Sequence, residues 1–263
     1  MDMRPQAHDI IRTWLFSTMT RSHHEFGCAP WSHAALSGWI LDPDRKKMSK
    51  SKGNVVTPLD LFETYGTDAV RYWAGSARPG VDTAFSEDQM KVGRKLANKL
   101  LNVTKFVLQF GAPTGDRSLD VGVTDLLARS MIAKLAQVTV EAPEAFGSVD
   151  SARALERTEA FFWLFCDNYV ELVKGRTYDE TRPDAADSAK RALRAALSTI
   201  QRLFAPILPF AGEEAWSWWN ESSIHVAPWP TRSAGTDEAF GDPTLIDATI
   251  DVLTRVRRAK TEA

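Results

Sequence analysis

The pattern of apolar and polar positions changes character near residue 59. Apolar residues in the segment 9–16 recur at a spacing compatible with a helix, and a loop-like stretch with Gly27 and Pro30 follows at 22–32. Residues 34–41 form a short apolar run bounded by Asp-Pro-Asp, which is typical of a buried strand that ends in a turn. The chain is therefore predicted to begin with α/β structure.

From about residue 59 onwards strand signals cease and amphipathic helical patterns follow one another. Short helices are predicted at 59–65 and 68–77, the first closed by Gly66. Ser86-Glu87-Asp88-Gln89 has the form of a capping box and predicts the start of a long helix. Its apolar residues recur every three or four positions or a multiple: Met90, Leu96, Leu100, Val103, Val107 and Phe110.

Three more long helices are predicted at about 124–140, 151–174 and 187–204, with Gly- and Pro-containing loops between them. An aromatic-rich helix follows at 210–219, and most of its tryptophans are assigned to the core. Four long helices with short connections predict a bundle. The fold class is accordingly mainly α, with an α/β segment at the start.

Composition agrees with a folded, water-soluble protein: 44% of the 263 residues are hydrophobic and 25% are charged. No apolar run reaches membrane-spanning length, and the first residues do not resemble a secretory signal, so a cytoplasmic location is expected. Cys28 and Cys166 lack CxxC spacing. Both are expected to be reduced packing residues, and no metal site is predicted.

A net charge of −2 gives no global signal for nucleic acid, so such a partner would need local basic patches. Two runs stand out, and a solvated face is the competing interpretation of both. They are Arg45, Lys46, Lys47, Lys50 and Lys52, and then Arg255, Arg257, Arg258 and Lys260.

The first basic run, 44–54, combines flexible ammonium groups, small hydroxyl residues and a glycine. Such a loop suits a mobile polyphosphate clamp, because lysine is a compact charge on a flexible stem. Residues 47–51 read KMSKS, which resembles the second signature of class I aminoacyl-tRNA synthetases.

The resemblance implies an ATP-binding motif of Lys47, Met48, Ser49, Lys50 and Ser51. It also implies that Lys47 and Lys50 are catalytic and stabilise the charge on departing pyrophosphate, alongside Mg²⁺. Gly53 and Asn54 would shape the loop's return. For the two serines, capping of the loop backbone is the alternative to a phosphate contact.

Further segments resemble the valyl-tRNA synthetase family in the expected order, among them YGTDAVRYWAGSARPGVD, KLLNVTKFVL and HVAPWP. The resemblance implies a C-terminal remnant of a Rossmann-type catalytic domain in residues 1–85 and an anticodon-binding helical bundle in 86–263. It implies ATP-dependent formation of valyl-adenylate and transfer to tRNA(Val) by a monomeric parent enzyme, with no membrane partner.

The family's first signature, HIGH, does not occur in the sequence, and its editing domain and coiled-coil arm are not found either. His23 and His24 do not match HIGH and are interpreted as exposed loop histidines. Because HIGH faces the same ATP phosphates as KMSKS, the chain is expected to hold half of a catalytic site. Activation of valine by this chain alone should be negligible.

Two weaker candidates come from related synthetases. Asp9 matches the position of an acid near the ATP ribose, and its alternative is an acid favoured by a helix N-terminus. The backbone at Ser37 and Gly38 is a candidate adenine contact, since a glycine lets a flat ring come close.

The long capped helix carries cations that either contact the tRNA backbone or form a solvated face: Lys91, Arg94, Lys95, Lys99 and Lys105. Three functions stay open on the sequence: part of a ligase, a freestanding tRNA-binding module, or a structural remnant without a partner.

Overall fold

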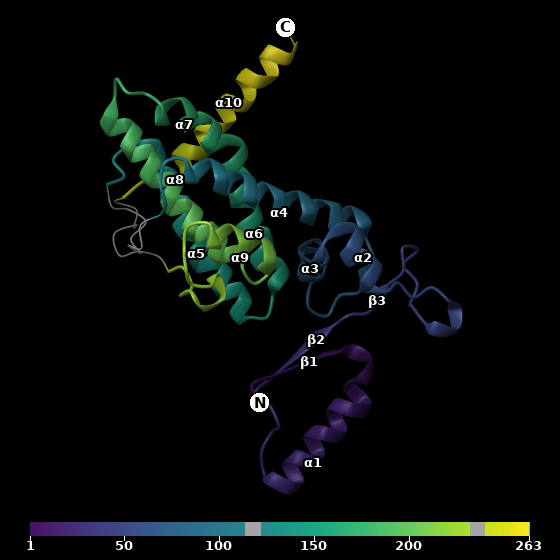
Figure 1. Cartoon of the computed structure of the whole chain (residues 1–263). Helices are drawn as coiled ribbons and strands as arrows, with labels where there is room; N and C mark the ends of the chain where they lie inside the picture. Colours follow the sequence, from purple (N-terminus) through teal and green to yellow (C-terminus); the bar gives the residue numbers. More distant parts are fainter. Residues whose placement is uncertain (114–121, 232–239, 263) are drawn as a thin grey trace. The chain divides into compact units, whose positions relative to one another are not determined.

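The computed structural model describes residues 1–113, 122–231 and 240–262, and α-helices dominate it (Figure 1). The chain divides into two compact units. The first comprises Met1–Arg94 with Ala145–Arg153, and the second comprises Lys95–Glu144 with Ala154–Ala263. Within the described residues, no helix combines the length and the apolar character that crossing a membrane requires.

The first unit contains two short parallel strand pairs. Strand β1 (Met3–Ala7) pairs with β2 (His33–Ser37), so Met3 lies opposite His33 and Ala7 opposite Ser37 (Figure 1). Strand β3 (Ile40–Leu41) pairs with β4 (Thr83–Ala84). The α/β start of the chain is confirmed, although β1 and β4 were not predicted.

The predicted single strand at 34–41 is wrong, because β2 and β3 are separate and have different partners. Neither is fully buried. The break falls at Gly38, where an added Cβ would lie 2.3 Å from the carbonyl carbon of Val81. The chain can change partner here because glycine lets the backbone of Val81 approach.

A continuous helical segment connects β1 to β2. It runs through a 3₁₀ turn (His8–Ile10) and a π turn (Ile11–Leu15) into helix α1 (Phe16–Phe26). The helix therefore occupies half of the stretch predicted as a loop at 22–32. It ends only at Gly27, whose φ of 69° supplies a left-handed C-cap.

The short helices of the first unit agree with the prediction. Helices α2 (Pro58–Tyr65) and α3 (Thr67–Gly75) are separated by Gly66 with φ of 88°. Helix α4 (Glu87–Leu108) begins after Ser86, whose hydroxyl accepts the backbone N–H of Gln89 at 3.3 Å. A cluster of Ala69, Val70, Trp73 and Met90 forms the core here.

The second unit is the predicted helical bundle. Its helices, after the later part of α4, are α5 (Leu126–Gly147), α6 (Ser151–Leu164), α7 (Val170–Thr177), α8 (Pro183–Phe204), α9 (Pro209–Ser217) and α10 (Thr244–Glu262). The helix predicted at 151–174 is in fact two helices joined by a π turn (Phe165–Tyr169). Helix α10 was not predicted. A further 3₁₀ turn occupies Ile224–Val226.

A buried glutamine organises part of this bundle. Gln201 is fully buried, donates to the hydroxyl of Thr104 at 3.1 Å and accepts the indole N–H of Trp219 at 3.1 Å. It thereby connects α8, α4 and the turn that follows α9. Of the tryptophans assigned to the core, Trp216 is buried, whereas Trp218 and Trp219 are half-buried.

Both cysteines are free, but only Cys166 packs in the core as predicted. Burial raises the pKa of its thiol far above the ordinary value. Cys28 is exposed, so its assignment as a packing residue is wrong.

Candidate functional site

The basic loop begins with a tight turn after β3. The backbone N–H of Arg45 donates to the carbonyl of Asp42 at 2.9 Å, and Arg45 has a φ of 62°. Asp42 in turn donates its N–H to the carbonyl of Lys46 at 2.9 Å, and Leu41 forms an antiparallel bridge with Lys47. The turn thus folds the first lysine of KMSKS back toward β3.

Asp42 and Asn54 close the loop from its two ends. The carboxamide of Asn54 donates to one oxygen of the buried Asp42 carboxylate at 2.7 Å. The backbone N–H of Lys46 donates to the other oxygen at 2.7 Å. These hydrogen bonds lower the pKa of Asp42 below its ordinary value, the Asn54 bond most of all.

Asn54 also contacts the motif itself. It donates to the carbonyl of Lys47 at 3.3 Å and accepts the backbone N–H of Ser49 at 2.9 Å. The backbone on both sides of Met48 is therefore fixed by one side chain. These contacts agree with the prediction that Asn54 shapes the end of the loop. The role of Asp42 in closing the loop was not recognised from the sequence.

The motif continues as a 3₁₀ turn (Lys50–Lys52) that Gly53 ends with a φ of 68°. The hydroxyls of Ser49 and Ser51 lie 3.3 Å apart. Lys47 and Lys50 are exposed, and neither forms an ion pair with any of the described residues. Cationic groups without a carboxylate partner are suited to binding an anion.

The ammonium group of Lys47 lies 3.9 Å from the ring centroid of Trp39. The ring of His8 lies 4.7 Å from the same indole, and its Nδ1 is 3.3 Å from the carbonyl oxygen of Ser37. Through these contacts the structure brings the turn that contains Asp9 close to the basic loop. Asp9 itself is exposed.

Asp9 and Gly38 each follow the carboxyl end of a strand, β1 and β2 respectively, and these strands are parallel. Ligands of open α/β sheets bind beyond such ends. The position of both residues is therefore compatible with their predicted roles. For Gly38 the backbone of Val81 supplies an additional, structural reason for a glycine.

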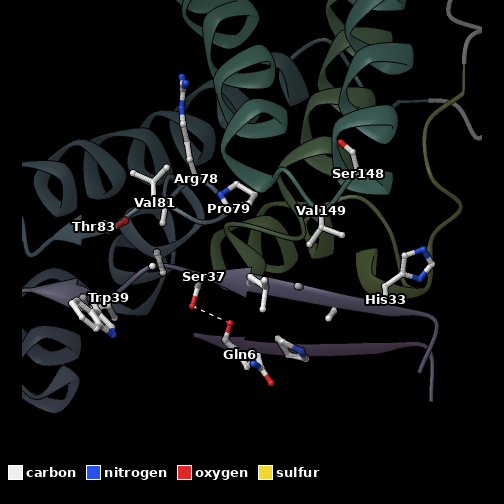
Figure 2. Close-up of a pocket in the computed structure, with 18 of the residues that line it drawn as sticks. Gln6, His33, Ser37, Trp39, Arg78, Pro79, Val81, Thr83, Ser148 and Val149 are labelled. Atoms are coloured by element: carbon white, nitrogen blue, oxygen red, sulfur yellow. Dashed lines mark hydrogen bonds between the residues drawn. The ribbon is translucent and has the colours of Figure 1, made fainter. Parts of the chain in front are cut away.

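A cavity of about 710 Å³ lies beside the end of β2 and is drawn in Figure 2. Its lining includes Gln6, Ser37, Trp39 and Val149. Gln6 Oε1 and Trp39 Nε1 are buried and have no hydrogen-bond partner among the residues that the structure describes. A volume in the range of ligand pockets, with one unpaired acceptor and one unpaired donor, fits an organic ligand with polar groups.

His23 and His24 are exposed, as expected, but they lie on α1 rather than in a loop. Their rings are 5.7 Å apart. Residues 1–113, 122–231 and 240–262 contain no group of three His, Cys, Asp or Glu side chains that could hold a metal ion.

The cations predicted on the long helix all have partners within the chain. In the first unit, Lys91 pairs with Asp88 at 2.9 Å and Arg94 donates to the carbonyl of Thr64 at 3.1 Å. In the second unit, Lys99 pairs with Asp167 at 2.9 Å. Lys95 and Lys105 each lie 5.4 Å from a tryptophan ring. These contacts favour a structural interpretation of the helix face, and its contact with the tRNA backbone stays a prediction.

Two family models match the chain. The model for class I tRNA synthetases of the isoleucine, leucine, methionine and valine group matches residues 1–86. The model for the anticodon-binding domain of tRNA ligases matches residues 128–263.

The chain is similar to valine–tRNA ligases along its whole length. It is 59% identical to the protein of Thermobifida fusca and 56% identical to that of Salinispora tropica, and it spans 30% and 32% of their lengths. A crystal structure of the Agrobacterium radiobacter K84 LeuRS–tRNA–LeuAMS complex has the same fold, with a TM-score of 0.71 at 17% identity over 88% of this chain and 28% of that chain. The chain therefore belongs to the class I aminoacyl-tRNA synthetases, in the valine–tRNA ligase family.

Proposed function

We propose that this chain supplies the KMSKS half of the ATP site, together with tRNA-binding surface, for a valine–tRNA ligase reaction. In that reaction the carboxylate of valine attacks the α-phosphorus of ATP, an oxygen–phosphorus bond forms, and the bond to pyrophosphate breaks. The valyl group then passes from the adenylate to a hydroxyl of tRNA(Val), the bond between its carbonyl carbon and the phosphate oxygen breaks, and AMP leaves.

One observation carries the proposal: Lys47 and Lys50 have no carboxylate partner among the described residues and lie on a loop that Asp42 and Asn54 close. The chain that holds this loop is 56–59% identical to valine–tRNA ligases. Negative charge grows on the leaving oxygen as the bond to pyrophosphate breaks. Positioned ammonium groups stabilise that charge more in the transition state than in the ground state, so they increase the rate.

The other parts of the ATP site are assigned by the same proposal. Asp9 would accept hydrogen bonds from ribose hydroxyls, and the backbone beside Gly38 would contact adenine. Mg²⁺ would accompany the phosphates, whose oxygens are ligands that it prefers. The bundle would hold tRNA by stacking on bases and by contacts to phosphates.

The test combines the purified chain with the part of the Thermobifida fusca relative that this chain does not match. We expect negligible valine-dependent ATP–pyrophosphate exchange from the chain alone and measurable exchange from the mixture. Exchange in the mixture that does not depend on Lys50, or robust exchange by the chain alone, would contradict the proposal.

A tRNA-binding module without a part in activation is the second candidate, because the anticodon-binding model covers residues 128–263. A gel shift with tRNA(Val) at low salt separates the candidates when it is read beside the exchange assay. Binding without exchange in the mixture would favour the module. Absence of both would favour a structural remnant.

A further inference from the structure

Trp39 and Lys47 form a contact that neither the family signature nor the proposed chemistry explains. The Lys47 ammonium lies 3.9 Å from the indole centroid, within the range of a cation–π interaction. Lys47 is the first lysine of KMSKS. Its charge is therefore held against an aromatic face, and no ion pair to it is found among the described residues.

The indole is held in place by its own neighbours. The backbone N–H of Trp39 donates to the carboxylate of Asp82 at 2.7 Å. The His8 ring packs 4.7 Å away at a tilt of 41°. Trp39 is half-buried between β2 and β3, so its position is set by the strands rather than by the loop.

The loop backbone is fixed so that Lys47 reaches the ring. Asn54 binds the carbonyl of Lys47 and is anchored on Asp42, and Lys47 bridges back to Leu41. Two contacts of the Lys47 backbone, one with Asn54 and one with Leu41, therefore define where the Lys47 side chain starts. The next lysine of the motif, Lys50, has no aromatic contact among those formed by the described residues.

We infer that Trp39 is a positioning residue that holds the Lys47 ammonium while no polyphosphate is bound and releases it when one binds. The inference rests on the proposed role of Lys47 at the ATP phosphates. A cation–π contact at an exposed site changes an equilibrium constant only about two- to five-fold, whereas a charge-assisted hydrogen bond to phosphate is stronger. The Lys47 ammonium therefore binds the phosphate in preference to the indole. Until a polyphosphate binds, the Trp39 ring keeps the Lys47 side chain ordered.

The experiment uses the whole chain with its lysines ¹³C-dimethylated, a modification that preserves the charge. The Lys47 signal is identified as the dimethyl-lysine signal that Lys47→Arg removes, which distinguishes it from Lys95 and Lys105 over other tryptophan rings. In the free chain it should be shifted upfield by the ring current of Trp39. Trp39→Leu should return the signal to the position of an exposed lysine. Trp39→Phe retains an aromatic face and should keep part of the shift.

Lys46 is the matched control, since its exposed side chain pairs with Asp44 and has no aromatic neighbour among the described contacts. Its signal should not respond to Trp39→Leu. Asn54→Ala leaves the ring intact but loosens the loop, so it should reduce the Lys47 shift. Circular dichroism of each variant verifies that it is folded.

Inorganic tripolyphosphate is the probe for release. On titration, the Lys47 signal should move to the unshifted position, and Trp39→Leu should bind the probe about two- to five-fold more tightly because it loses only the competing contact. An unshifted Lys47 signal in the free chain, or a shift that survives saturation with tripolyphosphate, overturns the inference. Failure to bind tripolyphosphate contradicts the proposed function instead, and the free-chain spectrum still decides whether Trp39 holds Lys47.

Discussion

The carboxamide of Asn54 donates to the carboxylate of Asp42 at 2.7 Å across 12 residues of sequence, and this hydrogen bond closes the KMSKS loop. The carboxylate is the acceptor, so its charged form is stabilised in the folded state. Protonation of Asp42 should weaken both the bond to Asn54 and the bond to the backbone of Lys46. The geometry of the loop is therefore linked to pH.

The first prediction follows from the lowered pKa of Asp42, for which the ordinary value is 3.8. Because the folded pKa is the lower one, the contribution to stability is fully present above 3.8 and is lost as pH falls through the folded pKa. The side-chain amide signals of Asn54 should move in that acidic window. Asp42→Asn cannot titrate, and a persistent transition in this variant would assign it to another group.

The second prediction concerns the break between β2 and β3. Gly38→Ala places a Cβ 2.3 Å from backbone atoms of Val81, so the strands must shift, and we expect a loss of at least about 1–3 kcal/mol in the free energy of unfolding. Gly147→Ala is the matched control in the same unit, because no atom lies within 4 Å of its added Cβ. Urea denaturation compares them. Equal effects would show that crowding at Val81 is not the reason for the glycine.

The third prediction tests the buried network in the bundle. Gln201→Ala leaves the indole N–H of Trp219 without its acceptor and opens space beside Thr104, and we expect a cost of about 2–4 kcal/mol. Denaturation followed by tryptophan fluorescence measures it. Ser198→Ala on the same helix is the comparison, and its effect should be smaller because Ser198 is only half-buried.

The fourth prediction separates the two cysteines. Cys28 is exposed, whereas Cys166 is buried and burial raises its thiol pKa. Since the thiolate is the reactive form, Cys28 should be alkylated rapidly by iodoacetamide in the native protein and Cys166 only on unfolding. Mass spectrometry of labelled peptides reads both sites. Rapid native labelling of Cys166 would show that the core around it opens.

The helices could be predicted from the sequence because their apolar residues repeat along one face. Met90, Leu96, Leu100 and Val107 are all fully buried on α4. Strands β1 and β4 could not, since β1 contains only five residues and β4 only two, and neither has a distinctive periodicity. A strand such as β4 forms because it pairs with β3. The local pattern of apolar and polar residues contains no information about that pairing.

The site was predicted unevenly for a similar reason. KMSKS could be found as a motif, and Asn54 lies three residues after its last serine. In the sequence Asp42 is typical of a turn residue, and only the structure shows that Asn54 binds it. Likewise Trp39 is typical of an apolar strand residue, and only the structure places the Lys47 ammonium over its ring. Such pairs depend on tertiary folding of the loop, which the sequence alone does not report.

The last prediction concerns the lysines proposed to be catalytic, and it is tested in the mixture of this chain and the complementary part of the Thermobifida fusca relative. Lys50→Ala should reduce kcat for valyl-adenylate formation about 100- to 1,000-fold, the typical effect of removing one positioned electrostatic donor. The apparent KM for valine should not increase to match, because the contact is made mainly in the transition state.

Lys46→Ala is the matched control one position outside the motif. Lys46 is exposed, with 68% of its side chain accessible, and it pairs only with Asp44 at 3.4 Å, so its charge is screened and its loss should matter little. Lys50→Arg keeps the charge but replaces a compact ammonium with a rigid planar group, and only partial activity is expected.

Single-turnover formation of valyl-adenylate, with tRNA omitted, compares the three variants without a contribution from the bundle. Equal and modest slowing by Lys46→Ala and Lys50→Ala would mean that the loop acts as a diffuse basic patch, and the roles proposed for Lys47 and Lys50 would then be wrong.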